Sequence, residues 1–66
     1  MHSHETITRL ALEKGLVQES LFFYDPISGN KINTAVFISK VRHLTEQKEI
    51  EEAVELCITD LRNKKS

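Results

Sequence analysis

Apolar residues recur at helical spacing in three stretches of this chain and at strand spacing in a fourth. In the first stretch, Ile7, Leu10 and Ala11 share one face of a helix, and Ser3 is a suitable N-cap for it. The pair Gly15-Leu16 predicts where this helix ends. Glycine adopts the left-handed conformation easily at this position, and the apolar residue after it can fold back onto the helix.

Residues 21–33 predict a β-hairpin. The stretch Tyr24–Asn30 reads YDPISGN, in which proline presets φ for a type I turn and glycine supplies a left-handed residue. Asp25 can accept hydrogen bonds from the backbone just ahead of it. A turn from Pro26 to Gly29 would place Phe23 opposite Ile32.

The predicted hairpin is apolar on both faces. Leu21 and Phe23 point to one side of the ribbon, and Phe22 and Tyr24 point to the other. A two-stranded ribbon with one face in water would alternate more cleanly. Two interpretations therefore stay open: helices cover both faces, or one aromatic face or the open edge of the ribbon meets a partner.

Residues 33–44 suit a strand or a helix, because Val36-Phe37-Ile38 is β-prone while the apolar residues also follow helical spacing. We expect a helix over Thr34–Leu44, with Asn33 as its N-cap. A final helix should follow a cap at Thr45. Its apolar stripe is long and continuous: Ile50, Ala53, Val54, Cys57, Ile58 and Leu61.

The last two stretches cannot share one straight helix, since their apolar residues would face different sides. We therefore predict a small α+β domain in the order helix, β-hairpin, helix, helix, with an all-α helical hairpin as the alternative. One domain should span residues 1–66, and residues 1–3 and 63–66 are expected to fray.

The segment from Lys31 through Leu61 is similar, in its helix spacing alone, to the helical hairpin of small enterobacterial two-component connector and biofilm-regulator proteins. That resemblance covers the C-terminal half of the chain. The hairpin signature at Tyr24–Asn30 has no place in an all-helical protein of that kind. No functional residue is therefore transferred from that family.

Composition and charge limit the function classes. The chain has 66 residues, nine basic against ten acidic side chains and a single cysteine. A near-neutral balance argues against a surface built as a whole for nucleic acid or anionic lipid. No internal disulfide can form, and the N-terminus lacks the features of a signal peptide. We expect a cytoplasmic protein with no membrane association.

No candidate chemistry outweighs its structural explanation. His2, His4 and Glu5 lie too close together in a terminal tail to form a spaced metal framework. Cys57 sits within an apolar stripe, where cysteine behaves as a small hydrophobic residue. No phosphate-binding loop or catalytic constellation is recognisable. We therefore expect no enzyme activity, no cofactor and no metal site.

A non-enzymatic protein-binding role follows from these exclusions: an adaptor, an inhibitor or a regulator whose partner is another protein. Phe22 and Tyr24 are the candidate contact residues on the hairpin. The stripe of the last helix is long for so small a core and suggests a homodimer, through Ile50, Val54, Ile58 and Leu61.

The alternative is a small nucleic-acid-binding or transcription-regulatory protein. Two helices joined by a tight turn could form a helix-turn-helix, with basic residues at Lys40, Arg42, Lys64 and Lys65. The first half of the second helix opposes this hypothesis, because Glu46, Glu49, Glu51 and Glu52 would repel phosphates. Nucleic acid is therefore the less favoured partner.

Overall fold

Three helices and three short strands make up the fold in the computed structural model, which describes residues 3–64. Their order is α1 (His4–Glu13), β1 (Val17–Glu19), β2 (Phe22–Tyr24), β3 (Lys31–Asn33), α2 (Thr34–Val41) and α3 (Gln47–Asn63). The α+β prediction is confirmed, and the all-α alternative is wrong because residues 17–33 form a sheet.

Both ends of α1 are set by local sequence, as predicted. The Ser3 hydroxyl oxygen accepts a hydrogen bond of 3.2 Å from the Thr6 amide. At the other end Gly15 has a φ of 109°, and the Leu16 amide donates to the Ala11 carbonyl at 3.1 Å. This backward bond, with the buried Leu16 side chain, closes the helix in a Schellman motif.

The sheet is antiparallel, in the order β1-β2-β3. The predicted hairpin pairing is confirmed, because Phe23 lies opposite Ile32. The strand β1 was not predicted: the sequence assigned no element to residues 17–19, yet Val17–Glu19 pairs with β2. A tight turn at Ser20-Leu21 joins the two strands, and Ser20 has a φ of 52°. Leu21 therefore lies in a turn and not in the hairpin strand where it was expected.

The ambiguous stretch after the hairpin divides into a strand and a helix. Residues 31–33 complete the sheet, and Asn33 then caps α2 by accepting hydrogen bonds from the Ala35 and Val36 amides at 2.9 and 3.3 Å. The helix ends at Val41, three residues before the expected Leu44. Leu44 still packs against the core, as its place in the helical spacing suggested.

The last helix, α3, begins close to its predicted start. Its N-cap position is Glu46, one residue after the expected Thr45, and the Glu46 side chain makes no capping hydrogen bond. A connection of five residues, 42–46, separates α2 from α3. The prediction of two helices, which allows both apolar faces to reach one core, is confirmed.

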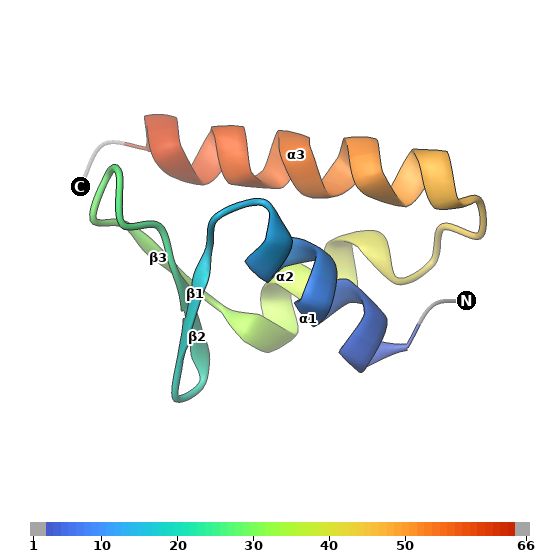
Figure 1. The fold of residues 1–66 in the computed structure, drawn as a ribbon, viewed down its shortest axis with the longest axis horizontal. Coiled ribbons are helices and arrows are strands. Elements are labelled where there is room, and N and C mark those ends of the chain that lie inside the picture. Colours follow the sequence, from blue (N-terminus) through green and yellow to red (C-terminus); the bar gives the residue numbers. More distant parts are fainter. Residues whose placement is uncertain (1–2, 65–66) are drawn as a thin grey trace.

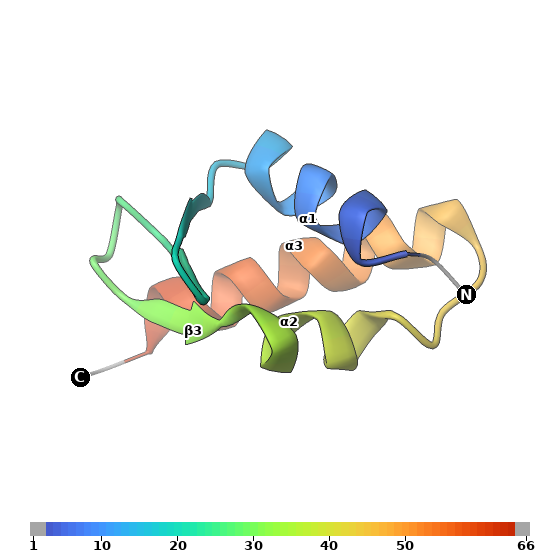
Figure 2. The same ribbon diagram turned by 90° about the horizontal axis from the view of Figure 1, so that it is seen from below.

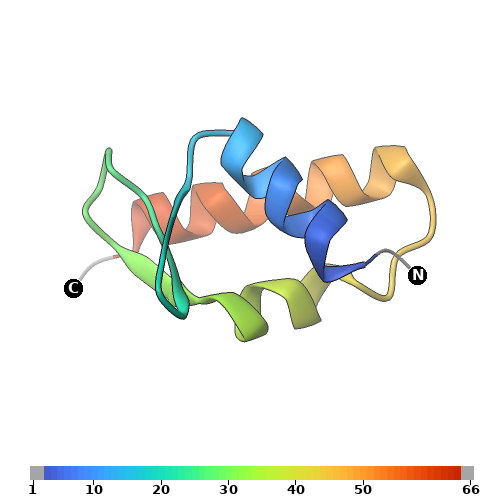
Figure 3. The same cartoon turned by 60° about the horizontal axis from the view of Figure 1, so that its bottom comes forward.

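The three helices pack against one another, and the sheet closes one end of this group. In Figure 1, α3 runs above α1 and α2, and Figure 2 shows α1 and α2 on the two sides of α3. Figure 3 shows the sheet beside the C-terminal end of α3. The buried core contains residues from every helix, from β2 and from the segment between α1 and β1: Ile7, Leu10, Ala11, Leu16, Phe23, Phe37, Ile38, Val41, Ile50, Val54, Ile58 and Leu61.

Part of the fraying expected at the termini falls on residues 1–2 and 65–66, which lie outside the described residues. Ser3 is the N-cap of α1, and Asn63 is the last residue of α3. The Lys64 carbonyl accepts a hydrogen bond from the Asn30 side chain. Within residues 3–64, none of the helices has the length and apolar character that crossing a membrane requires.

Candidate interaction surface

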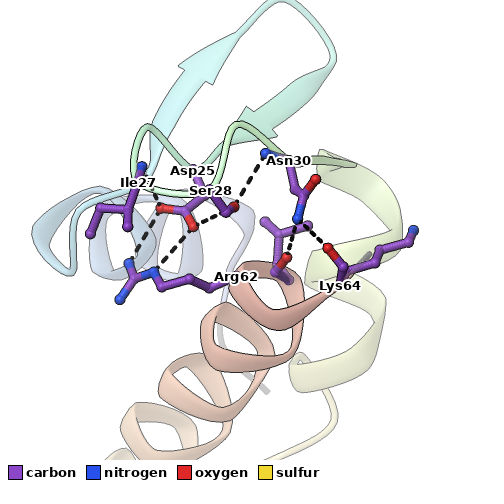
Figure 4. A network of polar contacts seen from close by, with 7 residues as sticks. Asp25, Ile27, Ser28, Asn30, Arg62 and Lys64 are labelled. Atoms are coloured by element: carbon purple, nitrogen blue, oxygen red, sulfur yellow. Dashed lines mark hydrogen bonds and ion pairs between the residues drawn. The ribbon is translucent and has the colours of Figure 1, made fainter. Parts of the chain in front are cut away.

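An ion pair holds the β2–β3 turn against α3 (Figure 4). Asp25 is fully buried, and Arg62 donates from Nε and Nη2 to its two carboxylate oxygens at 3.1 and 3.3 Å. The Ser28 hydroxyl donates to the same carboxylate at 2.8 Å, and the Ile27 amide donates at 3.3 Å. A buried carboxylate with this many donors is compensated for its loss of hydration.

The surroundings of Asp25 favour its charged form. The hydrogen bonds from the Arg62 guanidinium are the main cause that lowers the pKa of this carboxyl below its ordinary value of 3.8. Burial acts in the opposite direction, and the bonds from Ser28 and Ile27 add to the lowering. Asp25 is therefore an ionised structural residue and not a proton donor.

A second contact fixes the far end of the same turn. The Asn30 side-chain amide donates to the carbonyls of Leu61 and Lys64, each at 2.8 Å (Figure 4). These carbonyls belong to the C-terminal end of α3, where backbone acceptors lack partners within the helix. The Asn30 side chain therefore caps the C-terminal end of α3, and Arg62 of α3 in turn donates hydrogen bonds to the Asp25 carboxylate of the turn.

The inner face of the sheet meets the helices. Phe23 on the inner face is fully buried, and its ring packs edge-on against Phe37 of α2, with centroids 5.1 Å apart. Ile32, paired with Phe23, is partly buried against the same core. The interpretation that helices cover both faces is therefore wrong for the outer face, which no helix within residues 3–64 covers (Figure 1).

The outer sheet face is the candidate interaction surface. Phe22 is 38% exposed, Val17 is 44% exposed and Tyr24 is partly exposed. The Lys31 ammonium lies 5.4 Å from the centre of the Phe22 ring, a cation–π contact. Two neighbouring cross-strand rows make up this face: Val17, Tyr24 and Lys31 in one row, and Glu19, Phe22 and Asn33 in the other.

Exposed apolar side chains gather around this sheet. Seven large apolar residues are exposed within residues 3–64, and four of them belong to the sheet and its turns: Val17, Leu21, Phe22 and Ile27. Leu21 and Ile27, at the two turns, are more than two-thirds exposed. Single exposed apolar residues are ordinary, whereas several of them on and around one sheet make it the candidate for a contact surface.

Four of the six residues in the apolar stripe of α3 do not reach the surface. Ile50, Val54, Ile58 and Leu61 are buried in the chain's own core, at most 4% exposed. The structure therefore corrects the expectation that these four residues meet a second copy. The core is larger than the helix stripes alone predicted, because Leu16 and Phe23 of the inner sheet face also belong to it.

Two basic residues of the alternative hypothesis share a hollow with an acidic side chain. Lys40 and Lys64 line a shared hollow, but Cys57 and Asp60 line it too. Arg42 is the C-cap of α2 and does not line this hollow, and Lys65 lies outside the described residues.

Burial raises the pKa of the Cys57 thiol, so the thiol stays protonated and behaves as an apolar group.

Two residues of this surface were not predicted from the sequence. Val17 and Glu19 reach the outer sheet face because β1 pairs with β2. The apolar pair Leu16-Val17 behind the helix end at Gly15 was the available signal for β1. It is too short to separate a strand from a loop.

Comparison with known proteins adds no assignment to this geometry. The chain matches no protein-family model, no curated protein and no solved structure.

Proposed function

We propose that this chain is a non-enzymatic protein-binding module, an adaptor, inhibitor or regulator, and that its outer sheet face is the contact surface. The observation that carries the proposal is the partly exposed pair Phe22 and Tyr24, with Val17 opposite Tyr24, on a sheet face that no helix within residues 3–64 covers. Aromatic side chains supply much of the binding free energy at protein interfaces, because they bury a large area at low entropic cost.

The rigid support of this face favours the same role. β2 carries Phe23 into the core directly beside Phe22, and the Asp25–Arg62 ion pair fixes the end of the strand. A partner therefore meets aromatic rings that are already held in place, which reduces the entropy lost on binding.

A capture experiment tests the proposal. The tagged full chain is recovered from cells of its native source, with and without nuclease, and the bound proteins are identified by mass spectrometry. Wild type should retain at least one protein through nuclease treatment, and Phe22→Ala/Tyr24→Ala should lose it while remaining folded by circular dichroism. Leu56→Ala is the matched control, since Leu56 is 66% exposed on α3, away from the sheet.

Two results would overturn the proposal. One is a bound protein that the double variant retains as well as wild type does. The other is bound material that disappears with nuclease, which would instead support nucleic-acid binding and direct attention to Lys40, Arg42 and Lys64.

A further inference from the structure

The outer sheet face carries one acidic and one basic residue at opposite corners. Glu19 lies at the β1 edge in one cross-strand row, and Lys31 lies at the β3 edge in the neighbouring row. Phe22 and Tyr24 occupy the central strand between them. Neither corner residue has an ion-pair partner among residues 3–64, and both are exposed.

We propose that the outer sheet face binds a second copy of this chain, with Glu19 of each copy against Lys31 of the other. This inference rests on the proposed function and names the partner of the same surface. The interface is isologous, because a two-fold axis places the same residues on both sides.

The arrangement of charges selects this occupant. An acidic partner would be attracted by Lys31 and repelled by Glu19, and a basic partner would meet the reverse. Glu19 and Lys31 occupy one diagonal of the face, and Val17 and Asn33 occupy the other. A two-fold axis along the Val17–Asn33 diagonal, in the plane of the interface, places Glu19 of each copy over Lys31 of the other. Each carboxylate then faces an ammonium, and such complementarity selects the partner and the register.

The same axis brings the aromatic residues together. Phe22 and Tyr24 of the two copies gather between the two intermolecular ion pairs, and the strands of the two sheets cross steeply, as in orthogonal sheet packing. Water leaves the exposed parts of Val17 and Phe22. The Lys31 ammonium, already over the Phe22 ring, needs little movement to reach a carboxylate above it.

The size of the face sets the expected affinity. Six residues on three short strands offer less than the roughly 800 Å² per partner of a standard stable interface. We therefore expect a dissociation constant on the order of micromolar or weaker. Association must accordingly be measured up to high micromolar concentration.

Charge exchange at the two corners provides the test, with sedimentation equilibrium of the full chain as the measurement. Glu19→Lys alone and Lys31→Glu alone place like charges against each other and should each weaken self-association about tenfold or more. An equimolar mixture of these two variants should form a heterodimer, because every contact then pairs opposite charges. The double variant Glu19→Lys/Lys31→Glu should again form a homodimer.

Matched controls make the same charge changes elsewhere. Lys48→Glu and Glu52→Lys alter exposed residues of α3, distant from the sheet, and should associate as wild type does. Circular dichroism establishes that every variant is folded, and restored association in the double variant excludes misfolding as the cause of the single effects.

Three results would overturn the inference: a wild type that stays monomeric at high micromolar concentration, single variants that associate as wild type does, or a mixture that forms no heterodimer. The proposed function has a separate outcome. If the chain is monomeric and a different protein is still captured through Phe22 and Tyr24, the inference fails and the protein-binding proposal stands.

Discussion

Phe22 and Phe23 are neighbours in β2 and have opposite surroundings. Phe23 is fully buried and contacts Phe37, whereas Phe22 is 38% exposed beneath the Lys31 ammonium. Successive side chains of a strand point to opposite faces, so the alternation itself is unavoidable. The difference between the faces comes from their cover: helices pack on the inner face, and nothing in the described chain packs on the outer one.

The two turns of the sheet also differ in their surroundings: one contacts a helix and the other is exposed. The β2–β3 turn is polar and is held to α3 through Asp25, Asn30 and Arg62. The β1–β2 turn carries an exposed leucine and a serine with positive φ. One turn fixes the sheet to the helices, and the other belongs to the exposed side of the molecule. Stability and binding are therefore expected to depend on different residues of one small sheet.

The largest expected effect separates the two phenylalanines. Phe23→Ala should cost about 3–5 kcal/mol of the free energy of unfolding, because it leaves a cavity in the core. A domain of this length has a total of about 3–10 kcal/mol, so this variant should be largely unfolded. Phe22→Ala should cost only about 1 kcal/mol or less. Urea unfolding followed by circular dichroism measures both, and equal losses would contradict the distinction between the faces.

The next effect tests the attachment of the β2–β3 turn. Arg62→Ala should lower the free energy of unfolding by about 2–4 kcal/mol, since Asp25 would remain buried without its charged partner. Arg62→Lys should recover part of this loss, because a lysine restores the charge but not the two-pronged hydrogen bonding. The control is Arg9→Ala, which removes an exposed arginine of α1. If Arg9→Ala lowered the free energy of unfolding as much as Arg62→Ala does, the role of the ion pair would be refuted.

Acid should weaken the same attachment. Because the folded state lowers the pKa of Asp25, its contribution to stability is complete above the ordinary value of 3.8 and disappears as pH falls below it towards the lowered value. In that interval the unfolded chain binds the proton more readily than the folded chain does. Urea midpoints between pH 7 and pH 2 should therefore fall more steeply below pH 4 for wild type than for Asp25→Asn. Parallel profiles would show that other carboxyl groups dominate.

The smallest expected effect concerns the exposed turn. Ser20 has a φ of 52°, a conformation that costs a residue with a side chain more than it costs glycine. Ser20→Gly should raise the free energy of unfolding by about 0.5–1 kcal/mol, and association through the outer sheet face should not change. Thermal unfolding detects the gain, and a loss of stability would show that the serine is unstrained.

Much of the fold could be predicted from short-range patterns. The cap at Ser3, the helix end at Gly15-Leu16 and the turn at Tyr24–Asn30 each depend on a few adjacent residues, and the structure has all three. The register of the hairpin followed from the turn alone. Helical spacing separated the last two helices, although the expected boundaries shifted by one to three residues.

β1 and the cover of each apolar surface could not be predicted in this way. β1 has three residues and pairs only because β2 is beside it, so nothing in its own sequence distinguishes it from a loop. The α3 stripe and the Phe22–Tyr24 face both looked available for a partner. The structure buries the stripe and leaves the face exposed, and only the positions of the other elements decide between these outcomes.

The sequence by itself therefore determined the local elements, because capping, turn geometry and side-chain periodicity act between residues close along the chain. Tertiary structure decided which apolar surfaces remain exposed, because burial depends on segments distant along the chain. Arg62 and Asp25 are 37 positions apart, and their ion pair holds the β2–β3 turn against α3. The candidate interaction surface is the part of the sheet that this docking leaves uncovered.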